Sequence, residues 1–310
     1  MIGHHVPVHV HVTVHLLLCV IFALLTAASN AGAAVLQRKA AAQVPPERSM
    51  HVSLVADLMR RRVWLAGISL VIVAALCQAA ALAFGPIALV QPIFIIELPV
   101  TLVLATLILR NRQAVHQLPW AAIITTTIAL GAGLAIAAPS GATDAAQNTS
   151  WIIALIATAC FEALLITAAL GVHGEPRAAL LGLAAACGYA LTAALMKNAM
   201  ADLGDGAVQF FTSWHVYATA VAGVGALFLL QNALQAGSLV ASQPMLTVGD
   251  ALISISLGVT LFSEQLRVGW WLLPEIVALA AIIFGCVQIA KSPLASESAP
   301  LVSETASTVR

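Results

Sequence analysis

Long apolar runs separated by short polar segments make up most of the chain. An α-helix needs about 20 predominantly apolar residues to cross the hydrocarbon core of a bilayer, and nine runs reach that length. We therefore predict an all-α integral membrane protein with nine spanning helices. Their residue ranges are 14–36, 63–84, 86–109, 119–138, 151–171, 177–197, 210–231, 238–262 and 270–290.

The composition supports this assignment. Hydrophobic residues make up 61% of the chain and charged residues 8%, whereas a soluble domain carries about 25% charged residues. The lipid bilayer is therefore the expected surroundings. The formal net charge is zero and the basic residues form no broad patch, which argues against a nucleic-acid partner. The five cysteines lie in apolar runs without metal-ligand spacing, so we expect helix packing and no cofactor.

The ends of the chain differ from its apolar body. Residues 1–13 form a His-rich tail, for which a metal-binding role and an unstructured start both stay open. The run from Leu16 to Leu36 lacks the basic segment of a signal peptide, so we interpret it as the first spanning helix. Residues 291–310 are rich in Ser, Glu, Ala and Pro, and we predict them to be disordered.

Basic residues are distributed unevenly between the two predicted sides of the membrane. With the N-terminus outside, the inside segments hold eleven of the 13 Lys and Arg residues. The outside segments hold only Lys197 and Arg267. Because cytoplasmic loops carry an excess of Lys and Arg, we predict a cytoplasmic (plasma) membrane protein with its N-terminus outside and its C-terminus in the cytoplasm.

An internal repeat relates two parts of the chain. Residues 78–94 match residues 230–246 at an offset of 152, with glycines at Gly85 and Gly237 and a Gln-Pro pair in each copy. The repeat predicts two four-helix halves, 14–138 and 177–290, joined by a connecting helix at 151–171. Five crossings separate equivalent helices, so the halves have opposite topology. Inverted repeats are typical of alternating-access transporters, although a duplication kept for packing is the alternative.

These segments resemble the drug/metabolite transporter superfamily, in its EamA-like branch. The resemblance lies in ALQAGSLVASQPMLTVGDALISISLGVTLFSEQL, in its counterpart ALAFGPIALVQPIFIIELPV and in AAVLQRKA. Nine spans with this Gln-Pro pattern look most like the NIPA-type magnesium-transporter relatives. The resemblance implies a multi-pass transporter. Many family members have a Gly-Glu-Arg-like end to the eighth helix, whereas this chain has Ser263-Glu264-Gln265, and this departure weakens any role that the resemblance implies for the loop.

Three acids lie near the middle of predicted spans, namely Glu97, Glu162 and Asp250. A charge at a helix centre costs roughly 2.5–3.5 kcal/mol, so such residues usually mark an ion or substrate path. No Lys or Arg is predicted at the same depth, so each acid is expected to hold a proton, bind a cation or contact water. Glu97 and Asp250 lie one position apart under the repeat. By contrast, we expect Lys197 and Glu264 near the outer interface.

Polar residues and prolines accompany the acids. Residues 243, 247, 250 and 254 share one helical face. The prolines free carbonyls at depth, which is tolerated inside protein or along a cavity. Besides the acids, the predicted pathway includes Gln91, Gln243, Thr247, Ser254, Thr101, Asn30 and Tyr189. The predicted helix kinks are at Pro92, Pro99 and Pro244.

No sequence motif of an enzyme is present, so we expect a non-enzyme. The leading hypothesis is a drug/metabolite-type secondary transporter that couples protons or cations to a small solute through Glu97 and Asp250. The alternative is a transporter of Mg²⁺ or another divalent cation, with Glu97 and Asp250 as metal ligands. A further alternative is a non-transporting membrane scaffold. Whether the chain forms a homodimer stays open.

Overall fold

The computed structural model describes residues 8–41, 62–109, 118–140, 148–236 and 239–291. Helices account for nearly all of this part of the chain, and the one β-bridge within it joins Ser140 to Gln265. The first half contains α1 (Val8–Ala41), α3 (Arg62–Phe84), α4 (Ile87–Ile93), the 3-10 turn η2 (Phe94–Ile96), α5 (Glu97–Leu109) and α6 (Trp120–Ala137). The remainder contains α7 (Asn148–Leu170), α8 (Glu175–Gly204), α9 (Ala207–Thr212), α10 (Trp214–Ala236), α11 (Leu239–Phe262), the 3-10 turn η4 (Gly269–Trp271) and α12 (Leu272–Ala290).

Eight helices of the described residues are long and apolar enough to cross a membrane. The all-α prediction is therefore confirmed. The span predicted at 210–231 differs, because α9 and α10 divide it and the apolar stretch of α10, Trp214–Leu230, is shorter than the other eight. The span predicted at 86–109 is interrupted by η2. Helix α1 starts at Val8, within the predicted His-rich tail, and residues 1–7 and 292–310 lie outside the described residues.

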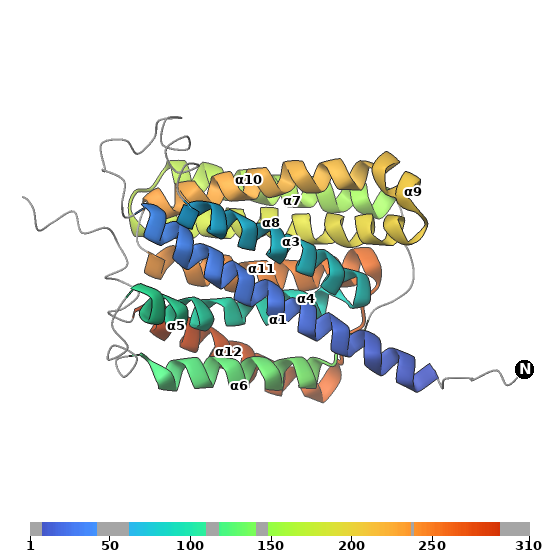
Figure 1. The fold of residues 1–310 in the computed structure, drawn as a ribbon, viewed down its shortest axis with the longest axis horizontal. Coiled ribbons are helices and arrows are strands. Elements are labelled where there is room, and N and C mark those ends of the chain that lie inside the picture. The colour runs from blue at the N-terminus through green and yellow to red at the C-terminus, as the bar shows by residue number, and fades with distance from the viewer. Residues whose placement is uncertain (1–7, 42–61, 110–117, 141–147, 237–238, 292–310) are drawn as a thin grey trace, which may run out of the picture.

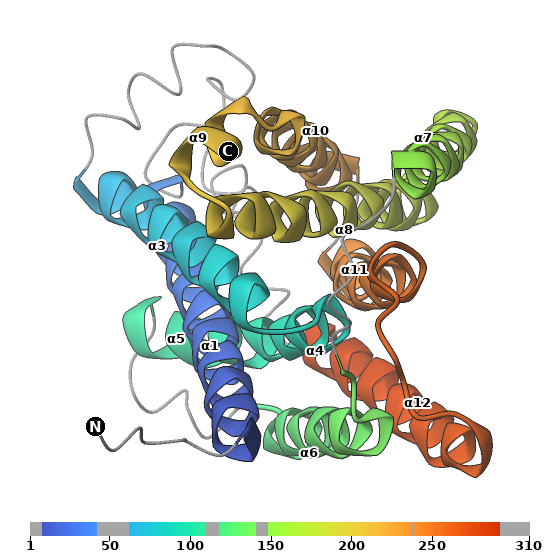
Figure 2. The same cartoon turned by 90° about the vertical axis from the view of Figure 1, so that its right-hand side faces the viewer.

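Most of the long helices pack side by side in pairs. Helix α1 lies along α3, α8 lies along both α10 and α11, and α6 lies along α12. In the centre, α4 contacts α11, while α7 lies against α8 at the periphery. Figures 1 and 2 show these neighbours, with α11 between α8 and the α6–α12 pair. The arrangement places α1, α4, α5, α8 and α11 around the middle of the molecule.

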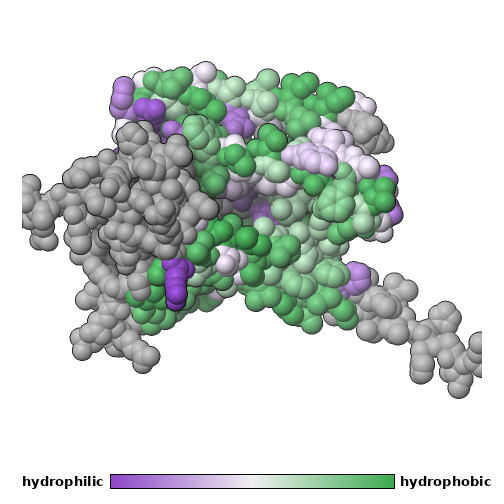
Figure 3. Space-filling view, turned by 45° about the horizontal axis from the view of Figure 1, so that its top comes forward, coloured by the Kyte–Doolittle hydropathy of each residue, from purple (hydrophilic) through white to green (hydrophobic). Residues whose placement is uncertain are grey.

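The outer surface is apolar, as a bilayer requires. Large aliphatic and aromatic side chains on several helices are more than half exposed, among them Leu76, Ile128, Ile153, Leu164, Val221 and Phe228. Figure 3 shows a mostly apolar face, with a few hydrophilic residues at its edges and in a hollow near its centre. An apolar surface of this extent is stable only in contact with lipid. Trp270 and Trp271 are exposed beside the start of α12, where aromatic residues anchor a membrane interface.

Small residues allow the close packing of α8. Its buried positions are largely alanine, and two of its glycines touch neighbouring helices. A Cβ atom at Gly182 would lie 2.7 Å from the carbonyl oxygen of Ser242 on α11, and one at Gly188 would lie 2.8 Å from the Cβ of Ala226 on α10. Helix association inside a membrane depends on this kind of close approach, because lipid supplies no hydrophobic driving force between helices.

We predict that Gly182→Ala lowers the melting temperature of the purified protein. The new methyl group collides with a backbone carbonyl that no side-chain rotation can move, and overpacking costs roughly 1–3 kcal/mol. Gly225→Ala is the matched control, because nothing lies within 4 Å of its Cβ position. Both changes gain helix propensity of about 1 kcal/mol, so their difference isolates packing. Equal melting curves by tryptophan fluorescence would contradict the prediction.

Candidate functional site

Two predicted acids lie near the centre of the bundle. Glu97 begins α5 directly after the η2 turn, and Asp250 lies in the middle of α11. The two side chains are within electrostatic range of each other, and both are half-buried. The Asn30 side chain of α1 lies close to Glu97. The Ser254 hydroxyl donates to Oδ1 of Asp250 at 3.2 Å.

Tyr189 completes this group, which we call the acid-pair site: Glu97, Asp250, Asn30, Ser254 and Tyr189. Tyr189 lies on α8 and interacts electrostatically with both carboxyl groups. The structure thus brings together five residues that the sequence analysis proposed for the pathway. They come from four helices, α1, α5, α8 and α11, so the site forms only when both halves of the chain are folded.

The acid-pair site has an excess of acidic groups. The ion pairs among the described residues join Lys197 to Glu264 and His215 to Asp202, so neither involves Glu97 or Asp250. Two neighbouring carboxylates at membrane depth repel each other and are poorly solvated. They can therefore take up a proton or bind a cation, which are both steps that a transporter can use.

Gln91 supplies an unsatisfied amide near this level of the bundle. It is 2% exposed, and neither its Oε1 nor its Nε2 has a hydrogen-bond partner among the described residues. Buried amides are nearly always paired, because an unpaired one costs free energy. Gln91 therefore offers a free donor and a free acceptor inside the protein. The side chain of its repeat counterpart Gln243 lies outside the described residues.

The other predicted residues lie around the pair. Thr101 on α5 and Thr247 on α11 are half-buried, about one turn from Glu97 and Asp250 respectively. Glu162 lies on the peripheral helix α7, and it is related to Asp250 only through Cys187, with which both acids interact electrostatically. Of the predicted kink positions, Pro99 lies in α5 and Pro244 in α11, which are the helices of the two acids, and Pro92 lies in α4.

A metal ion at this site would have a limited set of ligands. No group of three or more His, Cys, Asp or Glu side chains that could hold a metal occurs in the described part of the chain. Glu97 and Asp250 would have to share the ion with neutral oxygens, such as those of Asn30 and Ser254. Mg²⁺ accepts such a set when it keeps several water ligands.

A second polar group, not proposed from the sequence, lies at the end of the bundle where α4 begins. The carboxylate of Glu264 accepts hydrogen bonds from the backbone N–H of Ile87 at 2.7 Å and from that of Ala88 at 2.8 Å. Lys197 donates to the same carboxylate at 2.9 Å and to the carbonyl of Gly85 at 3.0 Å. We call this arrangement the Glu264 cap.

The Glu264 cap corrects one expectation. We expected the charge of Glu264 near the outer interface, but Glu264 is only 3% exposed, so its charge is inside the protein. Its loop departs from the family pattern, yet it makes the main polar contact of this end. Helix α4 follows Pro86, which offers no side-chain cap, and its first N–H groups need an acceptor from elsewhere. The sequence signal for this contact was a helix start that has no Ser, Thr, Asp or Asn as its N-cap residue.

The surroundings of the Glu264 cap are tightly packed. A side chain at Gly258 would collide with the Glu264 carboxylate, and Lys197 Nζ lies 5.3 Å from the ring centroid of Phe262. The next residue, Gln265, exchanges two backbone hydrogen bonds of 3.0 Å with Ser140, which follows α6. The end of α6 is thereby tied to the same loop.

A group of polar and aromatic residues around His215 lies beside the Glu264 cap. The Nδ1 atom of His215 lies 2.8 Å from the hydroxyl of Ser213 and 3.2 Å from Oδ2 of Asp202. The ring of Trp151 is tilted against that of His215, with centroids 5.3 Å apart, and it also makes an edge contact with Phe262. The Nε2 atom of His215 has no hydrogen-bond partner among the described residues. These contacts join the starts of α7 and α10 to the end of α8.

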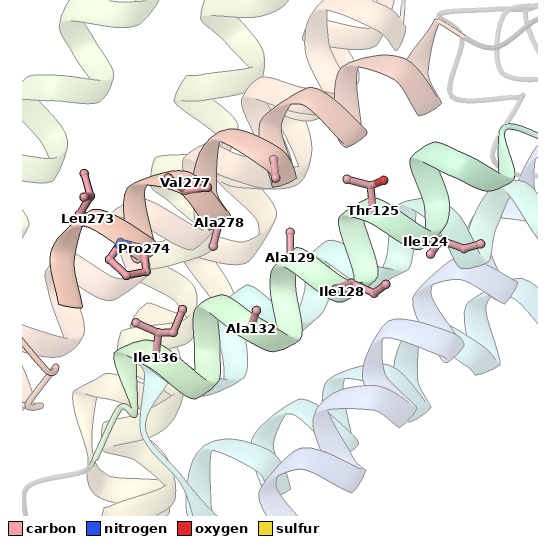
Figure 4. A pocket seen from close by; sticks show the side chains of 11 residues that line it. Ile124, Thr125, Ile128, Ala129, Ala132, Ile136, Leu273, Pro274, Val277 and Ala278 are labelled. Carbon is pink, nitrogen blue, oxygen red and sulfur yellow. The ribbon is translucent and has the colours of Figure 1, made fainter.

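Two grooves on the described part of the chain are apolar. A groove of about 670 Å³ lies between α6 and α12 and is lined by residues such as Ile128 and Val277 (Figure 4). A second groove of about 510 Å³ lies between α1, α4 and α6. Neither groove is lined by an acidic residue, and both are suited to lipid chains.

The fold and this site define the class of protein. The described residues form a multi-pass α-helical membrane protein with carboxylates at membrane depth. The chain is similar to an uncharacterized protein of Corynebacterium glutamicum, with 26% identity over 282 residues that cover 89% of this chain and 96% of that protein. No family model and no solved structure matches the chain. The similarity therefore extends over nearly the whole chain but assigns no function.

We predict that Glu264→Ala destabilises the protein more than Lys197→Met. Removing the carboxylate leaves two N–H groups of α4 and the Lys197 ammonium without their main acceptor, a kind of loss that costs about 3–5 kcal/mol. Without Lys197, the carboxylate still accepts both N–H groups at the positive end of α4. Unfolding in detergent, followed by tryptophan fluorescence, measures both variants. An equal or larger loss for Lys197→Met would contradict this order.

Proposed function

We propose that this chain is a secondary transporter that moves a small solute across a membrane and couples its movement to protons or cations at Glu97 and Asp250. The observation that carries the proposal is the acid pair itself: two interacting carboxyl groups on two discontinuous or proline-containing helices, with no basic partner among the described residues. A protein without a transport role gains nothing from such costly groups at membrane depth.

The arrangement of helices supports an inverted-repeat transporter. Helix α3 ends at Phe84 and α10 ends at Ala236, which are 152 positions apart, as are the starts of α4 at Ile87 and α11 at Leu239. The packing matches as well: α1 lies along α3 as α8 lies along α10, and α4 contacts α11 across the centre. This is the build that we propose, with α7 as the connecting helix and with the drug/metabolite superfamily as its relatives.

The mechanism follows from the ionisation of the acid pair. When both carboxyl groups are ionised, their repulsion favours binding of a cation or of a proton between them. Neutralising the pair lowers the cost of moving the site through the membrane. Asn30, Ser254 and Tyr189 would orient the carboxyl groups, and the unpaired amide of Gln91 would hydrogen-bond to the solute. Exchange of a proton for the solute would then drive alternating access.

A divalent cation is the second candidate substrate. The oxygen-rich content of the acid-pair site favours it, because Mg²⁺ needs only one or two carboxylates beside neutral oxygens and water. The two candidates differ in what crosses the membrane. A magnesium transporter moves Mg²⁺ itself, whereas the leading proposal moves protons when an organic solute is supplied.

Proteoliposomes distinguish these functions. We predict that vesicles containing the wild-type chain and a trapped pH dye show proton flux when small amines or neutral polar solutes are added. Glu97→Gln and Asp250→Asn should each reduce this flux at least tenfold, because each removes an ionisable group of the pair. Asp205→Asn is the control, since Asp205 is exposed at the end of α8 and should retain full flux.

A parallel set of vesicles carries a Mg²⁺ dye. Mg²⁺ entry that both substitutions abolish would replace the leading proposal with the divalent-cation transporter. If correctly inserted wild-type protein moves neither protons nor Mg²⁺, transport through the acid pair is refuted. Flux that persists in both variants would likewise remove Glu97 and Asp250 from the mechanism.

The proposed orientation has its own test. The excess of Lys and Arg in alternate loops predicts a C-terminus in the cytoplasm and an N-terminus outside. A green fluorescent protein fused after Arg310 should therefore be fluorescent in bacterial cells, and alkaline phosphatase fused there should be inactive. The opposite pattern would invert the proposed topology.

A further inference from the structure

The Glu264 cap connects the two helices that carry the acid pair. Glu264 follows α11, the helix of Asp250, and it holds the first turn of α4. Helix α4 has only seven residues and continues through η2 into Glu97. The two acid-bearing segments are thus fastened to each other at this end of the bundle. Any separation of α4 from α11 at this end must first break the Glu264 cap.

Two further elements converge at the same end. Lys197 near the end of α8 is bonded to Glu264 and to Gly85, the residue in the turn between α3 and α4. The backbone bridge between Gln265 and Ser140 adds the end of α6. Four membrane helices are therefore joined by polar contacts within a few residues. Polar contacts thus hold these helices together at this end of the bundle.

The repeat does not reproduce the Glu264 carboxylate. Under the offset of 152, the start of α4 corresponds to the start of α11, and Glu264 corresponds to position 112. Position 112 is Arg112, which lies outside the described residues. An arginine cannot accept a backbone N–H bond, and a positive charge is unfavourable at a helix N-terminus. The repeat therefore provides no acid equivalent to Glu264 for the start of α11.

We propose that the Glu264 cap is a one-sided gate, which closes a path to the acid pair from the face where α4 begins and has no equivalent acid at the repeat position for the opposite face. The proposal rests on the alternating-access function above. The gate opens when the α4 N-terminus leaves the Glu264 carboxylate. Because α4 leads to Glu97 and α11 carries Asp250, neutralising the acid pair changes the forces on both sides of the gate.

A native cysteine reports on this gate. Cys19 on α1 is fully buried, and it lies against Gly85, where any added side chain would collide with its sulfur. It is also within electrostatic range of Lys197 and Glu264. Opening the gate should therefore expose the Cys19 thiol to water on that face. In the closed state the thiol should react slowly.

The experiment measures modification of Cys19 by a membrane-impermeant maleimide. The full chain is used with Cys77, Cys160, Cys187 and Cys286 replaced by alanine, in vesicles of right-side-out and inside-out orientation. Glu264→Gln and Lys197→Met are the gate variants, and Asp205→Asn is the control. Both gate variants keep side chains of similar size, and size-exclusion profiles establish which preparations are folded.

We expect Glu264→Gln to be labelled at least tenfold faster than the parent, and only from the face where α4 begins. Lys197→Met keeps the carboxylate that accepts both N–H groups of α4, so it should be labelled more slowly than Glu264→Gln. Asp205→Asn should match the parent. Unchanged labelling of folded Glu264→Gln would overturn the proposal, and so would equal acceleration from both faces. One-sided acceleration in a protein that moves neither protons nor Mg²⁺ would retain the gate and refute the transport function. Transport together with faster labelling from both faces would retain the transport function and refute the gate.

Discussion

A polar group inside a membrane protein has no bulk water to bond, so every buried N–H, carbonyl and charge needs a partner from the chain itself. The break between α3 and α4 violates regular helix bonding, because Pro86 ends one ladder and leaves the first N–H groups of α4 unpaired. Glu264 meets that need from 177 positions away in the sequence, and Lys197 balances its charge. The positions of α4, α8 and α11 relative to one another depend on this set of bonds.

The acid-pair site differs from the Glu264 cap, because its carboxyl groups have no basic partner among the described residues. Glu97 and Asp250 interact with each other and with neutral side chains, so their charge is left without a permanent partner in the described residues. The unpaired amide of Gln91 belongs to the same pattern. The polar groups of the Glu264 cap are paired with one another, whereas those of the acid-pair site have no charged partner. The Glu264 cap fixes the helices, and the groups of the acid-pair site would gain free energy by binding a ligand.

Much of the fold could be predicted from the sequence because lipid imposes a simple length and polarity rule on each helix. That rule located the helices, and the polar spacing on one helical face correctly grouped Asp250 with Ser254. It could not find the Glu264 cap, because periodicity describes one helix at a time and says nothing of a bond between distant segments. The same limit explains why the sequence did not distinguish Glu162 from the other two acids. Glu162 lies on α7, a peripheral helix.

The alanine-rich surface of α8 has a consequence for movement. Alanine has no side-chain rotamers, so two helices in contact through alanine and glycine lose no rotamer entropy on packing and need no rotamer exchange to shift along each other. Interlocked leucines would have to leave their holes before a neighbouring helix could slide. At its alanine and glycine positions, α8 therefore allows α10 and α11 to shift along its axis with few side-chain rearrangements.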